Sequence, residues 1–227
     1  MIDPLSDEKI VDSWTKNAEP WTVAVRDGQI ESRRLVTNQA IVEAVLSRAP
    51  RSVLDVGCGE GWLVRALEGQ GVRAIGVDVV PALIEEARRA GPGEFRVASY
   101  EDIAAGVLDI SVDLAVANFS LIGMESVEAL LVAAHRLLTT NGSLVIQTLH
   151  PGMSSDPSQP YLDGWRSGSW VGFSSAFTDP APWYFRTLGS WIRLLIESKW
   201  RLLDVREPSH PVSGQPASVI FIAQTAG

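Results

Sequence analysis

Cysteine, histidine and basic residues are scarce in this chain of 227 residues. The single cysteine, Cys58, excludes a disulfide within the chain and suits a reducing compartment. One cysteine and three scattered histidines offer no metal-ligand spacing, so we expect no metal site. Because Asp and Glu outnumber Lys and Arg by 27 to 19, the net charge of −8 argues against a nucleic-acid surface and favours a small-molecule partner.

Long apolar runs and a signal sequence are also missing. No run approaches the roughly 20 apolar residues that span a bilayer. The N-terminus is acidic and polar, unlike a signal peptide. We therefore expect a cytoplasmic protein with no membrane span, folded as a single domain over residues 1–227.

Short apolar runs alternate with helical patterns through the middle of the chain. The predicted strands are 53–56, 72–78, 95–97, 112–117 and 143–149, and the predicted helices between or before them are 38–46, 62–67, 81–90 and 125–138. This alternation is typical of βαβ units and of an α/β fold with helices on both faces of a parallel sheet. A helix at 188–198 and an antiparallel hairpin of strands 201–205 and 218–224 follow.

Before this region, residues 5–19 have a helical pattern that we expect Pro20 to end, and residues 21–25 are expected to be extended. Asn141 and Gly142 are expected to close the helix at 125–138 as a left-handed cap.

The strongest motif is the glycine turn after the first strand, Asp55-Val-Gly57-Cys-Gly59-Glu-Gly61. Glycine lets backbone approach a ligand closely, and Asp78 at the end of the second strand can bind a ribose diol. A dinucleotide fingerprint has glycine where this chain has Trp62, and Asp55 would lie beside an anionic pyrophosphate. The motif therefore disfavours a nicotinamide oxidoreductase and suits a ligand that carries ammonium and sulfonium groups.

The run 53–61, together with Gly76-Val-Asp78, resembles the first two motifs of class I S-adenosylmethionine-dependent methyltransferases of the small-molecule, ubiquinone-biosynthesis-like type. The similarity covers roughly residues 35–150 and includes 98–103, Val116-Ala-Asn118 and Asn141-Gly142. It implies a Rossmann-like doubly wound sheet of about seven strands, mostly parallel with a reversed last strand. It also implies S-adenosyl-L-methionine as cofactor, and methyl transfer to an oxygen or nitrogen of a small-molecule acceptor of an aromatic or quinone-like kind.

The resemblance assigns cofactor contacts residue by residue. The backbone of Gly57, Cys58 and Gly59 would line the methionine part, Asp55 would lie near its amino group, Asp78 and Val79 would meet the ribose, and Ser99 and Tyr100 the adenine. Asn118 would face the transferred methyl group, or serve only as a strand-end cap. Arg33 is the candidate for the cofactor carboxylate, followed by Arg34 and Arg26, and a solvated surface arginine is the alternative for each of them.

The segment 150–187 interrupts the alternation and is rich in aromatic residues, Pro, Gly and Ser. A long irregular segment inside a domain is usually functional, so we expect a substrate lid, with packing over the sheet edge as the alternative. Its expected substrate-binding residues are Trp165, Trp183, Tyr184 and Arg186, the last paired with an anionic group of the substrate.

Two further expectations concern the residues around this lid. Residues 1–37 would form an N-terminal cap, in which Trp14 and Trp21 either close the cofactor site or only bury helix faces. His150, directly after the fifth strand, is the candidate general base, with a structural hydrogen bond as the alternative.

Two other functions stay open. A non-catalytic protein could keep the fold and the cofactor site. A nucleic-acid methyltransferase is disfavoured, because base chemistry would require Pro-Pro-aromatic after Asn118, where this chain has Phe-Ser-Leu.

Overall fold

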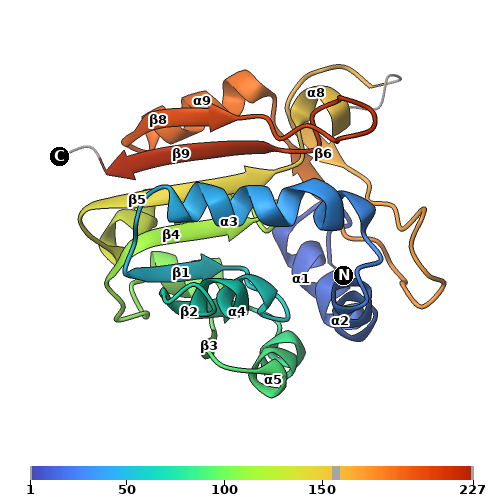
Figure 1. The fold of residues 1–227 in the computed structure, drawn as a ribbon. Coiled ribbons are helices and arrows are strands. Elements are labelled where there is room, and N and C mark those ends of the chain that lie inside the picture. The colour runs from blue at the N-terminus through green and yellow to red at the C-terminus, as the bar shows by residue number, and fades with distance from the viewer. Residues whose placement is uncertain (1, 155–158, 226–227) are drawn as a thin grey trace.

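A seven-stranded sheet organises the described residues, 2–154 and 159–225, in a computed structural model of the chain (Figure 1). The strand order is β3-β2-β1-β4-β5-β9-β8. The strands are β1 (Ser52–Val56), β2 (Arg73–Asp78), β3 (Glu94–Val97), β4 (Val112–Asn118), β5 (Leu138–Thr148), β8 (Trp200–Arg206) and β9 (Val219–Thr225). The strands β1 to β5 pair in parallel, whereas β9 is antiparallel to both of its neighbours. The predicted α/β sheet with a reversed last strand is confirmed.

Helices cover both faces of the sheet because successive strand side chains point to opposite sides. One face is covered by α3 (Asn38–Leu46), α4 (Trp62–Glu68) and α5 (Pro81–Ala90), the other by α6 (Tyr100–Ala104), α7 (Glu125–Ala133) and α9 (Leu188–Glu197). Val53 of β1 packs in the first apolar layer, and its neighbour Leu54 packs in the second. No helix in the described part of the chain is long and apolar enough to cross a membrane.

Three short helices precede α3: α1 (Asp7–Lys16), α2 (Ala18–Arg26) and the π-helix η1 (Arg33–Thr37). Figure 1 shows α1 and α2 beside the carboxyl ends of the parallel strands. The expected extended piece at 21–25 was wrong, because these residues are helical in α2. Pro20 does not interrupt the helix, since it occupies the first turn, where backbone N–H groups have no acceptor within the helix.

The helix expected at 125–138 ends earlier than predicted. A 3-10 turn, η2 (Ala134–Leu137), follows α7 and leads directly into β5. Asn141 does adopt a left-handed backbone, with φ of 63°. It lies inside β5, however, where the pairing with β4 passes from Leu138 directly to Ser143 and residues 139–142 bulge out.

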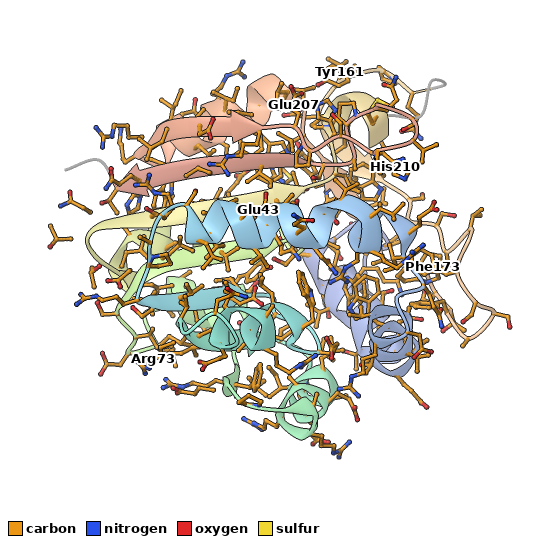
Figure 2. The ribbon with its side chains drawn as sticks, in the orientation of Figure 1. Glu43, Arg73, Tyr161, Phe173, Glu207 and His210 are labelled. Atoms are coloured by element: carbon orange, nitrogen blue, oxygen red, sulfur yellow. The ribbon has the colours of Figure 1, made fainter. Side chains whose placement is uncertain are left out.

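The segment after β5 contains a helical turn, α8 (Pro151–Ser154), and a separate hairpin of β6 (Gly164–Arg166) and β7 (Trp183–Phe185). Residues 155–158 of the expected lid lie outside the described residues. The chain between the two strands of the hairpin passes beside the N-terminal helices, and the side chain of Phe173 lies on this stretch (Figure 2).

Candidate active site

A cavity of about 370 Å³ lies at the carboxyl ends of β1, β2 and β4. Ligands of open α/β sheets bind at this edge, outside the carboxyl ends of the strands. The cavity is lined by all ten residues expected to bind the cofactor, Arg33, Asp55, Gly57, Cys58, Gly59, Asp78, Val79, Ser99, Tyr100 and Asn118. The N-terminal helices and the turn after β4 complete its walls.

The glycine turn contributes to the wall of this cavity, and at Gly57 and Gly61 there is no room for a side chain. Gly57, Gly59 and Gly61 have φ of 75°, 56° and 81°, the left-handed region that favours glycine. A Cβ at Gly57 would lie 2.4 Å from Ser120 Cβ, and the Ser120 hydroxyl is itself held by a hydrogen bond to the Val56 carbonyl. The turn is also bonded to β2, so it presents backbone to the cavity in a fixed position.

Asp78 is held in place by backbone donors. Its Oδ2 accepts from the Gly59 N–H at 2.9 Å, and its Oδ1 accepts from the Val80 N–H at 2.9 Å. Burial raises the pKa of Asp78, and these N–H groups oppose the shift. The carboxylate is therefore fixed at the end of β2, between the glycine turn and the start of α5.

Asp55 is the least satisfied polar group of the site. Its side chain is buried, and within the described structure Oδ1 has no hydrogen-bond partner. Burial, with the charge of Asp78 as the second cause, raises the pKa of Asp55 to about 8, while the Arg33 charge opposes the shift. Because a buried acceptor without a partner is costly, this carboxyl fits a ligand that brings a cationic donor into the cavity.

Arg33 contributes the positive charge of the cavity. Its guanidinium lies 5.5 Å from the ring centroid of Trp21 and 5.1 Å from that of Trp62. Burial lowers the pKa of Arg33 to about 10, so the group still carries its charge at neutral pH. An arginine held over aromatic rings in this way is a suitable partner for an anionic end of a ligand.

A buried ion pair that sequence reasoning missed connects the N-terminal segment to the glycine turn. Glu60, within the turn, accepts from Arg26 of α2 at 3.0 Å and from Arg65 of α4 at 2.7 Å. Its side chain is 1% exposed, so the two arginines together compensate a buried charge. The sequence signal for this ion pair was the position of an acidic residue, Glu60, between Gly59 and Gly61.

A second cavity of about 230 Å³ adjoins the first. The two share five lining residues, Trp14, Ile122, Thr148, Leu149 and Trp170. Its other walls are mainly apolar and aromatic, and they include the expected substrate residues Trp183, Tyr184 and Arg186. Trp165 and His150 are not among the described residues that line the two cavities.

Arg186 does not present its charge to this cavity as expected. Its guanidinium donates to the carbonyl oxygens of Gly123 at 2.7 Å and Met124 at 3.0 Å, and it lies over the rings of Tyr184 and Trp191. The side chain is 3% exposed, and burial lowers its pKa. Arg186 thus connects the hairpin to the turn before α7, which the sequence could not reveal because the carbonyls lie 63 and 62 residues away.

His150 contacts Glu207, just after β8, rather than a cavity. Its Nε2 lies 2.6 Å from Glu207 Oε1, and its Nδ1 accepts from the Gly152 N–H at 3.2 Å. Glu207 is labelled in Figure 2. Trp165 packs edge-on against Tyr184 at a ring-centroid distance of 5.6 Å. The expected base and one expected substrate residue thus contact Glu207 and Tyr184, respectively.

The N-terminal helices and the stretch before β7 are clasped together across the cavities. Asn17 Nδ2 donates to the Thr178 carbonyl at 2.7 Å, and the Thr178 N–H donates back to Asn17 Oδ1 at 2.9 Å. Trp14 contacts Trp170 at a centroid distance of 5.7 Å. Trp170 and Phe173 also line the first cavity, which sequence reasoning did not anticipate beyond the general richness of this segment in aromatic residues.

The strand order, the glycine turn and the carboxylate at the end of β2 define the class I S-adenosylmethionine-dependent methyltransferase fold. Residues 54–146 match the family model described as a methyltransferase domain. Residues 54–146 therefore carry a methyltransferase domain of the class I S-adenosylmethionine-dependent type, and the resemblance predicted from the sequence is confirmed.

Known proteins agree with this assignment. A ubiquinone biosynthesis O-methyltransferase of Xanthomonas oryzae pv. oryzae is 34% identical over 114 residues, which are 48% of this chain and 47% of that protein. The chain thus spans about half the length of this curated relative. A methyltransferase structure from Clostridium acetobutylicum aligns over 94% of this chain and 99% of its own, with 13% identity and a TM-score of 0.67.

A further structure is the Burkholderia thailandensis 1,6-didemethyltoxoflavin-N1-methyltransferase with bound 1,6-didemethyltoxoflavin and S-adenosylhomocysteine. It covers 100% of this chain and 94% of its own at 19% identity, with a TM-score of 0.62. At such identities, the likeness to both structures concerns the fold.

Proposed function

We propose that this protein transfers the methyl group of S-adenosylmethionine to an oxygen or nitrogen of a small aromatic acceptor. The observation that carries the proposal is the buried, unpartnered Asp55 carboxyl beside a cavity that the glycine turn helps to line. A ligand with an ammonium group would supply the partner that Asp55 lacks. The residues of the first cavity thus fit this cofactor.

The cofactor would be held along the whole cavity. Asp55 would bind its amino group, Arg33 its carboxylate, and Asp78 its ribose hydroxyls. The backbone of Gly57 to Gly59 would line the methionine part, and Ser99 and Tyr100 would adjoin the adenine. Ser99 supports this order, because its side chain and that of Asp102 form a capping box that fixes the start of α6 at the cavity wall.

When bound, S-adenosylmethionine supplies an electrophilic methyl group on a sulfonium. The work left to the protein is to align the acceptor with this group and to exclude water. Trp14, Trp21 and Trp170 provide a mainly apolar wall suited to both tasks. His150 lines neither cavity, so the proposed transfer does not use His150 as a base.

The acceptor would occupy the second cavity. A cavity of about 150 Å³ holds benzene, so 230 Å³ suits a one- or two-ring compound. The walls are aromatic, and the one charged residue among the described lining residues, Arg186, is bonded to carbonyl groups. We therefore infer a flat acceptor that is neutral where it meets these rings. The names of the relatives include both an O- and an N-methyltransferase, which supports either atom as the recipient.

We also propose that residues 1–37 cap the cofactor and that the segment 150–187 acts as the substrate lid. Support comes from the ion pairs of Glu60, from the shared wall of Trp14 and Trp170, and from the Asn17 clasp. The two pieces would then enclose both ligands together.

Binding and transfer are tested separately. S-adenosylhomocysteine should raise the melting temperature of the protein, whereas NADH should not; the reverse result would refute the proposal. A screen with labelled S-adenosylmethionine across phenols, quinone precursors, aromatic amines and small acids should then find transfer to an aromatic oxygen or nitrogen. Tight cofactor binding without transfer to any member would favour a non-catalytic binding protein.

Changing Asp78 to Ala should weaken binding of S-adenosylhomocysteine at least tenfold, measured by calorimetry. The change removes charge-assisted hydrogen bonds worth about 1.5–3 kcal/mol. Asp109→Ala is the matched control, because Asp109 is exposed and not a lining residue of the cavity. Equal affinities of the two variants would place the ribose elsewhere.

A further inference from the structure

A chain of hydrogen-bonded amides reaches the first cavity from the interior of the sheet. Gln147 in β5 is 1% exposed and pairs in register with Asn118 at the end of β4. Its Nε2 donates to the Thr37 carbonyl at 3.0 Å and to Asn118 Oδ1 at 2.7 Å. Its Oε1 accepts from the Ser218 hydroxyl at 3.0 Å.

The orientation of both amides follows from the Thr37 carbonyl. A backbone carbonyl can only accept, so the Gln147 atom that faces it must be the NH₂ group. The second hydrogen of that group points to Asn118, which must therefore present its oxygen to Gln147. The Asn118 NH₂ group is left as the free end of the relay, and it makes no hydrogen bond to another described residue while Asn118 lines the cavity.

Asn118 lines the first cavity, and its strand partner Gln147 directly precedes residues that line both cavities. Thr148 and Leu149 directly follow Gln147 along β5, and both line the first and the second cavity. Asn118 is the register partner of Gln147 on the neighbouring strand. Under the proposed function, the cofactor and the acceptor meet where the two cavities adjoin.

We propose that Asn118 determines acceptor specificity by donating a hydrogen bond to a lone-pair oxygen of the acceptor, and that Gln147 is the positioning residue that fixes this donor. The inference rests on the proposed function and narrows its substrate class. The acceptor is an aromatic compound with a carbonyl or similar oxygen near the methylated atom. A compound that has only a hydrogen-bond donor at that place would face the Asn118 NH₂ group, which is also a donor, and is therefore rejected.

A matched pair of probes tests the donor directly. 1-Indanone and indane have nearly the same flat two-ring shape and differ in one carbonyl oxygen. In protein saturated with S-adenosylhomocysteine, 1-indanone should bind about tenfold more tightly than indane, as one hydrogen bond allows. Tryptophan fluorescence provides the readout, because Trp14, Trp170, Trp183 and Trp191 line the second cavity.

The isosteric variant Asn118→Leu should abolish this preference, and its affinity for S-adenosylhomocysteine is measured beside it. Gln147→Met should lose most of the preference too, because the Asn118 amide is then free to rotate. The double variant should be no worse than Asn118→Leu alone, as expected when one residue acts through the other. Gln224→Met is the matched control, since Gln224 in β9 bonds to the Asn141 carbonyl away from the cavities, and it should retain the preference.

Three results would overturn the inference. The wild-type protein could bind both probes equally or bind neither, and then no donor is offered to an acceptor. Alternatively, Asn118→Leu could weaken S-adenosylhomocysteine tenfold or more, which would assign the amide to the cofactor. If Gln147→Met fails to fold, the Asn118→Leu comparison still decides. Absence of S-adenosylhomocysteine binding in the wild type is a different result, because it refutes the proposed function itself.

Discussion

Among single residues, the glycines of the turn after β1 differ in what they exclude. Gly57 faces Ser120, whose hydroxyl is bonded to the Val56 carbonyl and whose side chain therefore cannot move aside easily. Gly59 has a similar left-handed φ, but the nearest atom to an added Cβ is Trp21 Nε1, at 3.5 Å. An alanine at Gly59 would therefore introduce backbone strain alone, whereas an alanine at Gly57 would introduce both backbone strain and steric overlap.

Gly57→Ala should destabilise the protein much more than Gly59→Ala. A left-handed backbone costs an alanine roughly 1–2 kcal/mol at either site, and overpacking at Gly57 adds about 1–3 kcal/mol. In a protein of this size each kcal/mol lowers the melting temperature by about 2–4 °C. Thermal melts without cofactor measure the difference, and equal melting temperatures of the two variants would contradict the packing argument.

The sequence predicted the positions of the residues at the strand ends better than the contacts of His150 and Arg186. Asp55, Asp78 and the glycines follow strand ends, so their place at one edge of the sheet follows from the element order. The partners of His150 and Arg186 lie about 60 residues away in the chain. No local pattern specifies such contacts, so these partners become visible only in the folded protein.

Among the elements, α1 and the stretch before β7 form the joint most open to experiment. Asn17, at the C-terminal end of α1, makes reciprocal hydrogen bonds with the Thr178 backbone. Lys9 and Lys16 also pair with Asp179, but these groups lie near the surface, where ion pairs contribute little and are screened by salt. The buried Asn17 amide should therefore dominate this joint.

Asn17→Ala should speed the dissociation of S-adenosylhomocysteine several-fold. The change removes the hydrogen bonds between Asn17 and the Thr178 backbone, which costs about 1–3 kcal/mol and loosens one side of the first cavity. Stopped-flow tryptophan fluorescence measures the rate, since Trp14 and Trp21 line the cavity. Thr15→Ala on the exposed face of α1 is the control, and it should leave the rate unchanged. An unchanged rate in Asn17→Ala would mean that the cofactor leaves without opening this joint.

The errors at this scale have a common physical origin. Pro20 was taken to end a helix, yet proline is tolerated within a first turn, and the start of α2 could not be seen in the apolar pattern. The strands were predicted well because buried parallel strands are continuous apolar runs bounded by turns. The hairpin of β6 and β7 is too short for such a pattern.

For the whole molecule, the fold was predictable and the second cavity was not. The sheet follows from alternation along the chain, whereas the second cavity is assembled from α1, the turn after β4, the end of β5 and the segment before α9. Each of these pieces contributes a few side chains, and their arrangement depends on long-range packing. The acceptor can therefore be inferred only from the assembled walls.

The pH dependence of the stability of the whole molecule should reflect the buried Asp55 carboxyl of the first cavity. The pKa of Asp55 is about 8 in the folded protein, against an ordinary value of 3.8. Between these values the folded state binds the proton more tightly than the unfolded state, so this group lowers stability as pH rises from about 4 to 8. Asp55→Asn removes this contribution. Without cofactor, its melting temperature should exceed that of the wild type at pH 8, and the gap should narrow toward pH 4.

Asp113→Asn is the control of opposite sign. The pKa of Asp113 is lowered, mainly by the Arg51 N–H, so its carboxylate stabilises the fold above its ordinary pKa and loses this effect in acid. That variant should melt below the wild type at pH 8. Asp55→Asn should also bind S-adenosylhomocysteine at least tenfold more weakly, since the ammonium group loses a charged partner. A lower melting temperature of Asp55→Asn at pH 8 would mean that the fold itself stabilises the ionised carboxylate, and Asp55 would then need no ligand to satisfy it.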